Sequence, residues 1–163
     1  MKTKLLVLAA LTVWLRADVA AQAQGNLVGT WKLVSATGAT ADGRVIDAPF
    51  GVHPTGFIIY SSDGTMTAMI SHGGRKALSG DRISSPAPER AEAYATFFAY
   101  GGRYSVKGNQ VIHHVEIASF PNWVGTDMVR IVKMSGDRLT LTTPALSVGG
   151  ASQTTELTWE RAK

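Results

Sequence analysis

The chain has 163 residues, a formal net charge of +4 and no cysteine. This composition suits one domain held by an apolar core, and it excludes both disulfides and a thiolate metal site. Its basic residues are scattered and not interleaved with aromatic residues, so the sequence does not predict nucleic-acid binding.

The first residues have the pattern of a secretory signal. Two lysines precede an apolar run over residues 5–15, and Ala21 and Ala23 provide the small side chains that a signal peptidase reads. The run is shorter than the roughly 20 residues needed to span a bilayer, so an integral membrane span is not predicted. We therefore expect a cleaved signal at residues 1–23, a domain over residues 24–163, and a periplasmic or secreted protein.

The next segments alternate like strands. Residues 27–35 place apolar and polar side chains in turn, as in a strand with one buried face. A short edge strand is expected at residues 44–46, after an Asp-Gly turn pair. A second Asp-Gly pair, Asp63-Gly64, separates the apolar runs 57–60 and 65–70 and predicts the clearest hairpin in the chain.

The middle of the chain changes in character. Residues 72–88 are rich in Gly, Ser and Pro and are expected to form a loop. Residues 89–100 are alanine-rich and place Tyr94, Phe97 and Phe98 at helical spacing, which predicts a short amphipathic helix. Pro88 suits its first turn, and Gly101-Gly102 is expected to end it.

Strand patterns return after this segment. They cover residues 103–106, 110–119, 128–134, 138–143 and 154–161, with turn-forming residues between them. Eight or nine short antiparallel strands must close or form a sandwich to protect their edges. We expect an all-β fold, an up-and-down barrel of about eight strands with one short helix, which is wide enough to hold one small ligand.

Several motifs along the chain carry a family resemblance. They are residues 29–35, 54–60, Asp63-Gly64, 99–104, 113–116, 121–126, Arg130, 139–141 and 159–161. In this order and spacing, they resemble the bacterial and fungal lipocalin-like domain family from about Leu27 to Arg161. Gly29 and Trp31 look like the Gly-x-Trp signature of lipocalins. The resemblance implies a calycin-type barrel and no settled activity, and the loop and helix at 71–101 depart from the simplest lipocalin pattern.

Two polar residues interrupt apolar strand faces. Alternation along residues 110–119 puts His113 on the same face as Val111, Val115 and Ile117, which we assign to the barrel interior, and turns His114 and Glu116 outward. Arg130 shares a face with Met128, Val132 and Met134. Because consecutive histidines of a strand point in opposite directions, no metal site is predicted.

The remaining candidates are aromatic. Tyr60, Tyr100 and Tyr104 offer hydroxyl groups beside apolar surface, and Trp123 lies in a turn where it either covers the mouth or plugs it. Trp31 and Arg161 are expected to stack and close one barrel end, without being a site. The predicted ligand-binding residues are therefore His113, Arg130, Tyr60, Tyr104 and Trp123.

Two functions fit this set of residues. The first is an exported module that binds one small, mostly apolar molecule in the barrel. The second is a cofactor-free isomerase, cyclase or lyase in which His113 acts as general acid or base beside Arg130 or a tyrosine. No phosphate loop, dinucleotide fingerprint or nucleophile elbow occurs, so no cofactor is predicted, and the choice between binder and enzyme stays open.

Overall fold

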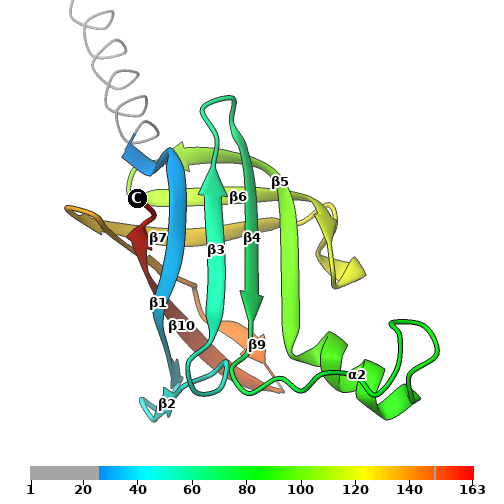
Figure 1. The fold of residues 1–163 in the computed structure, drawn as a ribbon. Helices are drawn as coiled ribbons and strands as arrows, with labels where there is room; N and C mark the ends of the chain where they lie inside the picture. Colours follow the sequence, from blue (N-terminus) through cyan, green and yellow to red (C-terminus); the bar gives the residue numbers. More distant parts are fainter. Residues whose placement is uncertain (1–25, 149) are drawn as a thin grey trace, which may run out of the picture.

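The computed structural model describes residues 26–148 and 150–163 and shows a barrel of antiparallel strands (Figure 1). The predicted signal at residues 1–23 lies outside the described residues. The strands are β1 (Gly29–Thr40), β2 (Val45–Asp47), β3 (Thr55–Tyr60), β4 (Thr65–Ser71), β5 (Phe97–Lys107), β6 (Gln110–Ala118), β7 (Asp127–Ser135), β8 (Arg138–Thr142), β9 (Leu146–Val148) and β10 (Ala151–Arg161). The α-helix α2 (Ala87–Ala95) precedes β5, and the 3₁₀ helix η1 (Pro121–Trp123) joins β6 to β7.

Eight of these strands close on themselves. Their order is β1, β3, β4, β5, β6, β7, β8 and β10, and β10 pairs again with β1. The short strands β2 and β9 extend β1 and β10 beyond this ring. The predicted up-and-down barrel of about eight strands with a short helix is therefore confirmed.

One barrel end is closed by a stacked arginine. The guanidinium of Arg161 lies 4.1 Å from the Trp31 ring centroid and donates hydrogen bonds to the carbonyls of Val28 and Asn26, at 2.8 and 2.9 Å. A Cβ atom at Gly29 would lie 2.5 Å from the Arg161 Nη1 atom, so only glycine leaves room for this contact. The predicted closure by Trp31 and Arg161 is confirmed.

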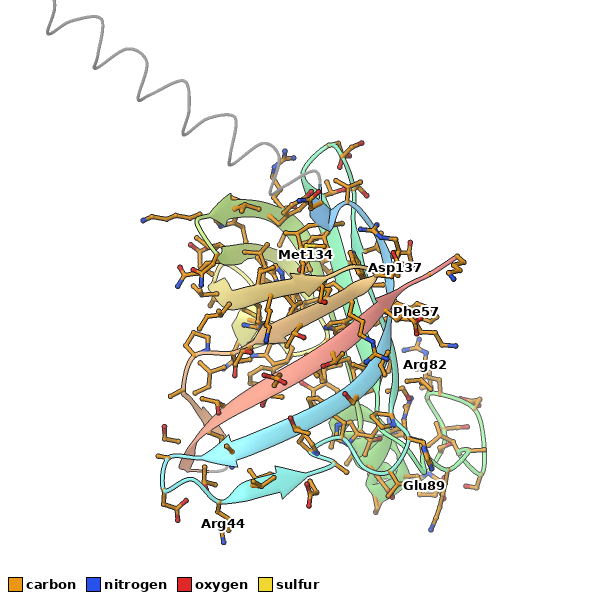
Figure 2. All side chains as sticks on the ribbon, turned by 90° about the vertical axis from the view of Figure 1, so that its left-hand side faces the viewer. Arg44, Phe57, Arg82, Glu89, Met134 and Asp137 are labelled. Carbon is orange, nitrogen blue, oxygen red and sulfur yellow. The ribbon has the colours of Figure 1, made fainter. Side chains whose placement is uncertain are left out.

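The opposite end of the barrel is the mouth. It is formed by the β1–β2 turn, the 48–54 loop, α2 with its preceding loop, and η1 (Figure 1). Figure 2 shows Arg44 in the β1–β2 turn and Glu89 in α2 toward this end, with Asp137 of the β7–β8 turn toward the closed end. Within the described residues, no helix combines the length and the apolar character needed to cross a membrane.

The core lies inside the barrel because alternate side chains of each strand point inward. The largest side chains buried there are Trp31, Trp159, Tyr60, Leu27, Ile58, Ile70, Leu139, Leu141, His113 and Val111. All of these except His113 are aromatic or aliphatic. One imidazole is thus held inside an otherwise apolar and phenolic interior.

The predicted helix at residues 89–100 is wrong at its C-terminal end. Helix α2 ends at Ala95, and its neighbour Phe97 already begins β5, where Phe98 pairs with Ile70 and Tyr100 with Ala68 of β4. None of the α2 side chains is buried, so the expected apolar helix face does not exist. Sheet pairing overrides the helical spacing of these residues, because it places Phe98 and Tyr100 on the inner face against the core.

Two glycines expected to stop the helix lie inside β5 instead. At Gly102 a Cβ atom would overlap the carbonyl oxygen of His114 and approach the Glu116 nitrogen to 2.8 Å, so β6 crosses too closely for any side chain. The β5–β6 register shifts at this point, as in a β-bulge. Beyond the shift Ile117 points outward and is 71% exposed, which corrects its predicted place on the inner face.

Candidate functional site

The imidazole of His113 occupies the centre of the candidate site. Strand β6 places it between Tyr104 of β5 and Met128 of β7, and its side chain is completely buried. The ring nitrogen Nε2 lies 2.8 Å from the Tyr60 hydroxyl, and Nδ1 lies 3.0 Å from the Tyr100 hydroxyl. We call Tyr60, His113 and Tyr100 the phenol–imidazole network.

The histidine in this network is neutral. Burial, the Arg130 charge and, to a smaller extent, His114 lower the pKa of His113 from 6.5 to about 3. A neutral imidazole has one N–H and one acceptor nitrogen. One tyrosine therefore accepts from the ring and keeps its own O–H for another partner, whereas the other tyrosine donates to the ring and presents only lone pairs.

The two phenols remain protonated at ordinary pH. Burial raises the pKa of Tyr60 well above 10.0, with further contributions from Tyr100 and Tyr104, against the opposing charge of Arg130. Burial also raises the pKa of Tyr100, and the charge of Arg130 opposes that shift. The charge of Arg130 thus lowers the pKa of all three members of the network.

The Arg130 side chain is half-buried on β7, beside the network. Its Nη1 donates to the carbonyl oxygen of Val129 at 2.8 Å, and its Nη2 lies 3.5 Å from the Met128 sulfur. A thioether is a weak acceptor, so Nη2 keeps donor capacity for a stronger partner. The inner face that Arg130 was predicted to share with Met128, Val132 and Met134 is the face that packs on the core.

Tyr104 supports the network from the closed end. Its hydroxyl donates to the carbonyl oxygen of Ser61 at 3.0 Å, and its ring packs edge-on against Tyr60 with centroids 4.9 Å apart. This places Tyr104 behind Tyr60, as a group that fixes the phenol in position.

Trp123 lies at the mouth, in a group of aromatic rings. Its ring centroid is 5.8 Å from that of Phe98, 5.9 Å from Tyr100 and 5.6 Å from Phe120. Phe50 extends the group, since it contacts both Phe98 and His72. We call Phe50, His72, Phe98, Phe120 and Trp123 the mouth aromatic cluster. Through Tyr100, it is in ring contact with His113.

The sequence offered Tyr100 as a phenol and Phe98 as a lumen residue, but it placed both in the wrong element, and Tyr100 was not among the five predicted ligand-binding residues. Both were assigned to a helix, although the alternation of Phe98, Tyr100 and the following glycines is also a period-two strand pattern. The five residues that the sequence predicted do lie together: Tyr60, Tyr104, His113 and Arg130 in and around the network, and Trp123 at its mouth side. Their role in binding a ligand stays a prediction.

Two cavities lie outside the network. One of ≈ 300 Å³ is bounded by α2 and residues 75–79, and one of ≈ 210 Å³ lies at the closed end beside Leu27 and Met134. His113 lines neither of them. Among the described residues, no three His, Asp or Glu side chains gather as a metal site.

Comparison with known proteins gives two findings. A family model described as a lipocalin-like domain matches residues 28–162. The chain is also similar to the 4'-hydroxy-3'-methoxypropiophenone carrier protein ppsC of Aspergillus oryzae (strain ATCC 42149 / RIB 40). The two are 37% identical over 99 residues, which cover 55% of this chain and 85% of the carrier protein.

Proposed function

This protein belongs to the lipocalin-like domain family, and we propose that it carries a small aromatic ketone inside its barrel. The observation that carries the proposal is the phenol–imidazole network, one imidazole and two phenols that are hydrogen-bonded to each other and buried on an otherwise apolar inner face. Ligand sites of small barrels combine this kind of apolar wall with few, well-placed polar groups.

The ligand named for the similar carrier protein fits this chemistry. A 4'-hydroxy-3'-methoxypropiophenone has an aromatic ring, a ketone oxygen that accepts hydrogen bonds, and a phenol. The ligand ring can form stacked or edge-to-face contacts with the rings of Trp123, Phe98 and Tyr100. The ketone suits a donor hydroxyl of the network, and the phenol oxygen suits the Arg130 guanidinium. We propose phenolic aryl ketones as the ligand class.

The position of Arg130 favours one direction for the hydrogen bonds. The positive charge of Arg130 favours Tyr100 as a donor over Tyr100 as an acceptor, so Tyr100 gives its own proton to Nδ1 of His113. Nε2 then carries the ring proton and donates to Tyr60. The Tyr60 O–H is left to donate to the ketone of the ligand.

Calorimetric titration of the purified protein with 4'-hydroxy-3'-methoxypropiophenone tests this function. We expect one ligand per chain and weaker binding of 4-propyl-2-methoxyphenol, which keeps the ring and the phenol but lacks the ketone. Loss of one hydrogen bond from a buried polar group reduces affinity by about tenfold. Absence of binding by both compounds would refute the carrier function.

Two tyrosine variants separate the donor from its support. Tyr60→Phe removes the proposed donor and is expected to reduce ketone affinity by about tenfold, toward that of the propyl analogue. Tyr104→Phe is the matched control, because it removes a neighbouring phenol hydroxyl that donates to the Ser61 carbonyl. Equal losses in both variants would contradict the assignment of Tyr60 as donor.

A cofactor-free enzyme acting on the same ligand is the second candidate. The specific observation in its favour is the Arg130 charge beside the network, which suits stabilisation of an enolate, and the low pKa of His113 predicts that removal of the α-proton is slow. Incubation of the ketone with protein in D₂O, followed by NMR of the α-protons, distinguishes the two. Exchange that His113→Gln abolishes indicates an enzyme, and binding without exchange indicates a carrier.

We also propose that the protein is exported, on the basis of the signal pattern at residues 1–23. N-terminal sequencing of the protein recovered from its native cells tests this. The expected N-terminus lies close to residue 24, and an N-terminus at Met1 in a cytoplasmic fraction would contradict export.

A further inference from the structure

Three polar side chains form a connected group on the outer face of the barrel. Ser105 of β5, His114 of β6 and Asp127 of β7 come from three neighbouring strands. The Ser105 Oγ atom lies 2.9 Å from Nε2 of His114, and Nδ1 of the same ring lies 2.7 Å from Oδ1 of Asp127. We call these residues the outer-face triad. They lie on the opposite face of the sheet from His113.

The outer-face triad has the arrangement of a hydroxyl nucleophile, a general base and a carboxylate that orients the base. The Asp127 carboxylate fixes the His114 tautomer that carries its proton on Nδ1. This leaves Nε2 as the acceptor for the Ser105 hydroxyl proton. Both ring nitrogens are thus engaged in the same way as in Ser-His-Asp hydrolases.

The triad is accessible and has an apolar neighbour. The side chains of His114 and Asp127 are 41% and 64% exposed, so a solute can reach the ring. On the same outer face, Ile112 lies opposite Ser105, and Val129 lies opposite Ile112 in the sheet register. An acyl chain held on Ser105 would rest on these aliphatic side chains.

We propose that Ser105 is a nucleophile, activated by His114 and Asp127, that reacts with activated esters of short apolar acids. The Oγ atom attacks the ester carbonyl while Nε2 of His114 takes the hydroxyl proton. Collapse of the tetrahedral intermediate breaks the bond to the leaving group, which departs as an aryloxide or takes the proton from His114. Water then hydrolyses the acyl-serine by the same route, and it returns the carboxylic acid and the free hydroxyl.

The position of the triad limits the substrates. General-base activation contributes about 10²–10⁴-fold to rate. Backbone N–H groups within a strand are directed along the sheet into its hydrogen-bond ladder, away from a group standing on its outer face. A carbonyl oxygen on Ser105 thus gains little of the ~10²–10³-fold stabilisation that an oxyanion donor supplies. We therefore expect acylation by esters with good leaving groups, such as 4-nitrophenyl butyrate, and slow hydrolysis of the acyl-serine.

Mass spectrometry after incubation of the full chain with 4-nitrophenyl butyrate tests the inference. We expect one butyryl group per chain, located on Ser105, with release of an equal amount of 4-nitrophenolate in a burst. His114→Asn is expected to reduce the burst rate by about 100-fold, and Asp127→Asn to reduce it by a smaller factor. Ser105→Ala should abolish the modification.

Ser35 provides the matched control, because it is an exposed strand serine on β1 that has no histidine hydrogen bond among its described contacts. Ser35→Ala should leave the burst unchanged. The proposal would be contradicted if Ser105 were acylated no faster than Ser35, or if His114→Asn left the burst unchanged. The outer-face triad would then be a structural contact between strands and not a nucleophilic site. The result is independent of the carrier function, because Tyr60→Phe should alter ketone binding and leave the burst intact.

Discussion

His113 couples the protonation of one side chain to the stability of the barrel. Its folded pKa of about 3 lies below the value of 6.5 for an ordinary histidine, so the unfolded chain binds a proton first as the pH falls. The stabilising contribution is fully present above pH 6.5 and is lost as the pH falls toward 3. The loss amounts to about 1.4 kcal/mol for each pH unit inside this window.

Denaturant unfolding between about pH 7 and about pH 5 measures this coupling above the range in which carboxylates titrate. The free energy of unfolding should fall by about 2 kcal/mol in the wild type and by much less in His113→Gln. His72→Gln is the control, since His72 is only partly buried and burial lowers its pKa by less. A His113→Gln variant with the wild-type pH dependence would show that His113 is protonated in the folded protein.

At the scale of elements, Gly102 shows how closely β5 and β6 approach. Gly102→Ala should destabilise the protein by about 3 kcal/mol, because its Cβ would meet the backbone of β6. Gly108→Ala is the control: Gly108 has a φ of 60° and no atom within 4 Å of an added Cβ, so only backbone strain of about 1 kcal/mol is expected. Thermal unfolding of both variants checks this, and equal effects would contradict the close crossing.

We expect the mouth aromatic cluster to control entry to the network. Trp123 touches Phe98, Phe120 and Tyr100, so Trp123→Ala opens the path to His113 without removing a member of the network. We expect faster association and dissociation of the aryl ketone in stopped-flow experiments, with a smaller change in affinity. Rates equal to those of the wild type would place the entry path elsewhere.

The same elements show what sequence can predict. Period-two alternation located most strands of the barrel, because burial on one face dictates the residue type at every second position. It placed His113 correctly for the same reason. It failed at residues 97–102, where helical spacing and sheet pairing compete for the same aromatic residues, and at Ile117, where a bulge reverses the alternation. Because this part of β5 was predicted as a helix, the hydrogen bond between His113 and Tyr100 was not predicted either.

Contacts between distant segments could not be predicted from the sequence for a different reason. Asp127, His114 and Ser105 meet because three strands are aligned in a particular register, and the chain carries no local pattern that fixes this register. The outward direction of His114 was predictable from alternation. Its partners depend on cross-strand pairing, which local sequence determines only weakly.

At the scale of the whole molecule, the barrel depends on the contact that joins its first and last strands. Arg161→Ala should destabilise the protein by about 2–3 kcal/mol, because two backbone carbonyls lose charged donors and the Trp31 ring loses its cover. Lys133→Ala, at an exposed position of β7, should change stability by less than about 0.5 kcal/mol. Denaturant unfolding measures both, and a silent Arg161→Ala would contradict closure by this residue.

The central claim is that a ketone is bound by the phenol–imidazole network inside the barrel. Long-range ¹H–¹⁵N NMR of the histidine ring nitrogens tests it most directly, since it reports the tautomer of His113 and any change on ligand addition. We predict a neutral ring with its proton on Nε2, and a saturable shift of the His113 nitrogens on titration with 4'-hydroxy-3'-methoxypropiophenone, while the His114 nitrogens stay unchanged. Binding that leaves the His113 nitrogens unperturbed would place the ligand outside the network and contradict the account.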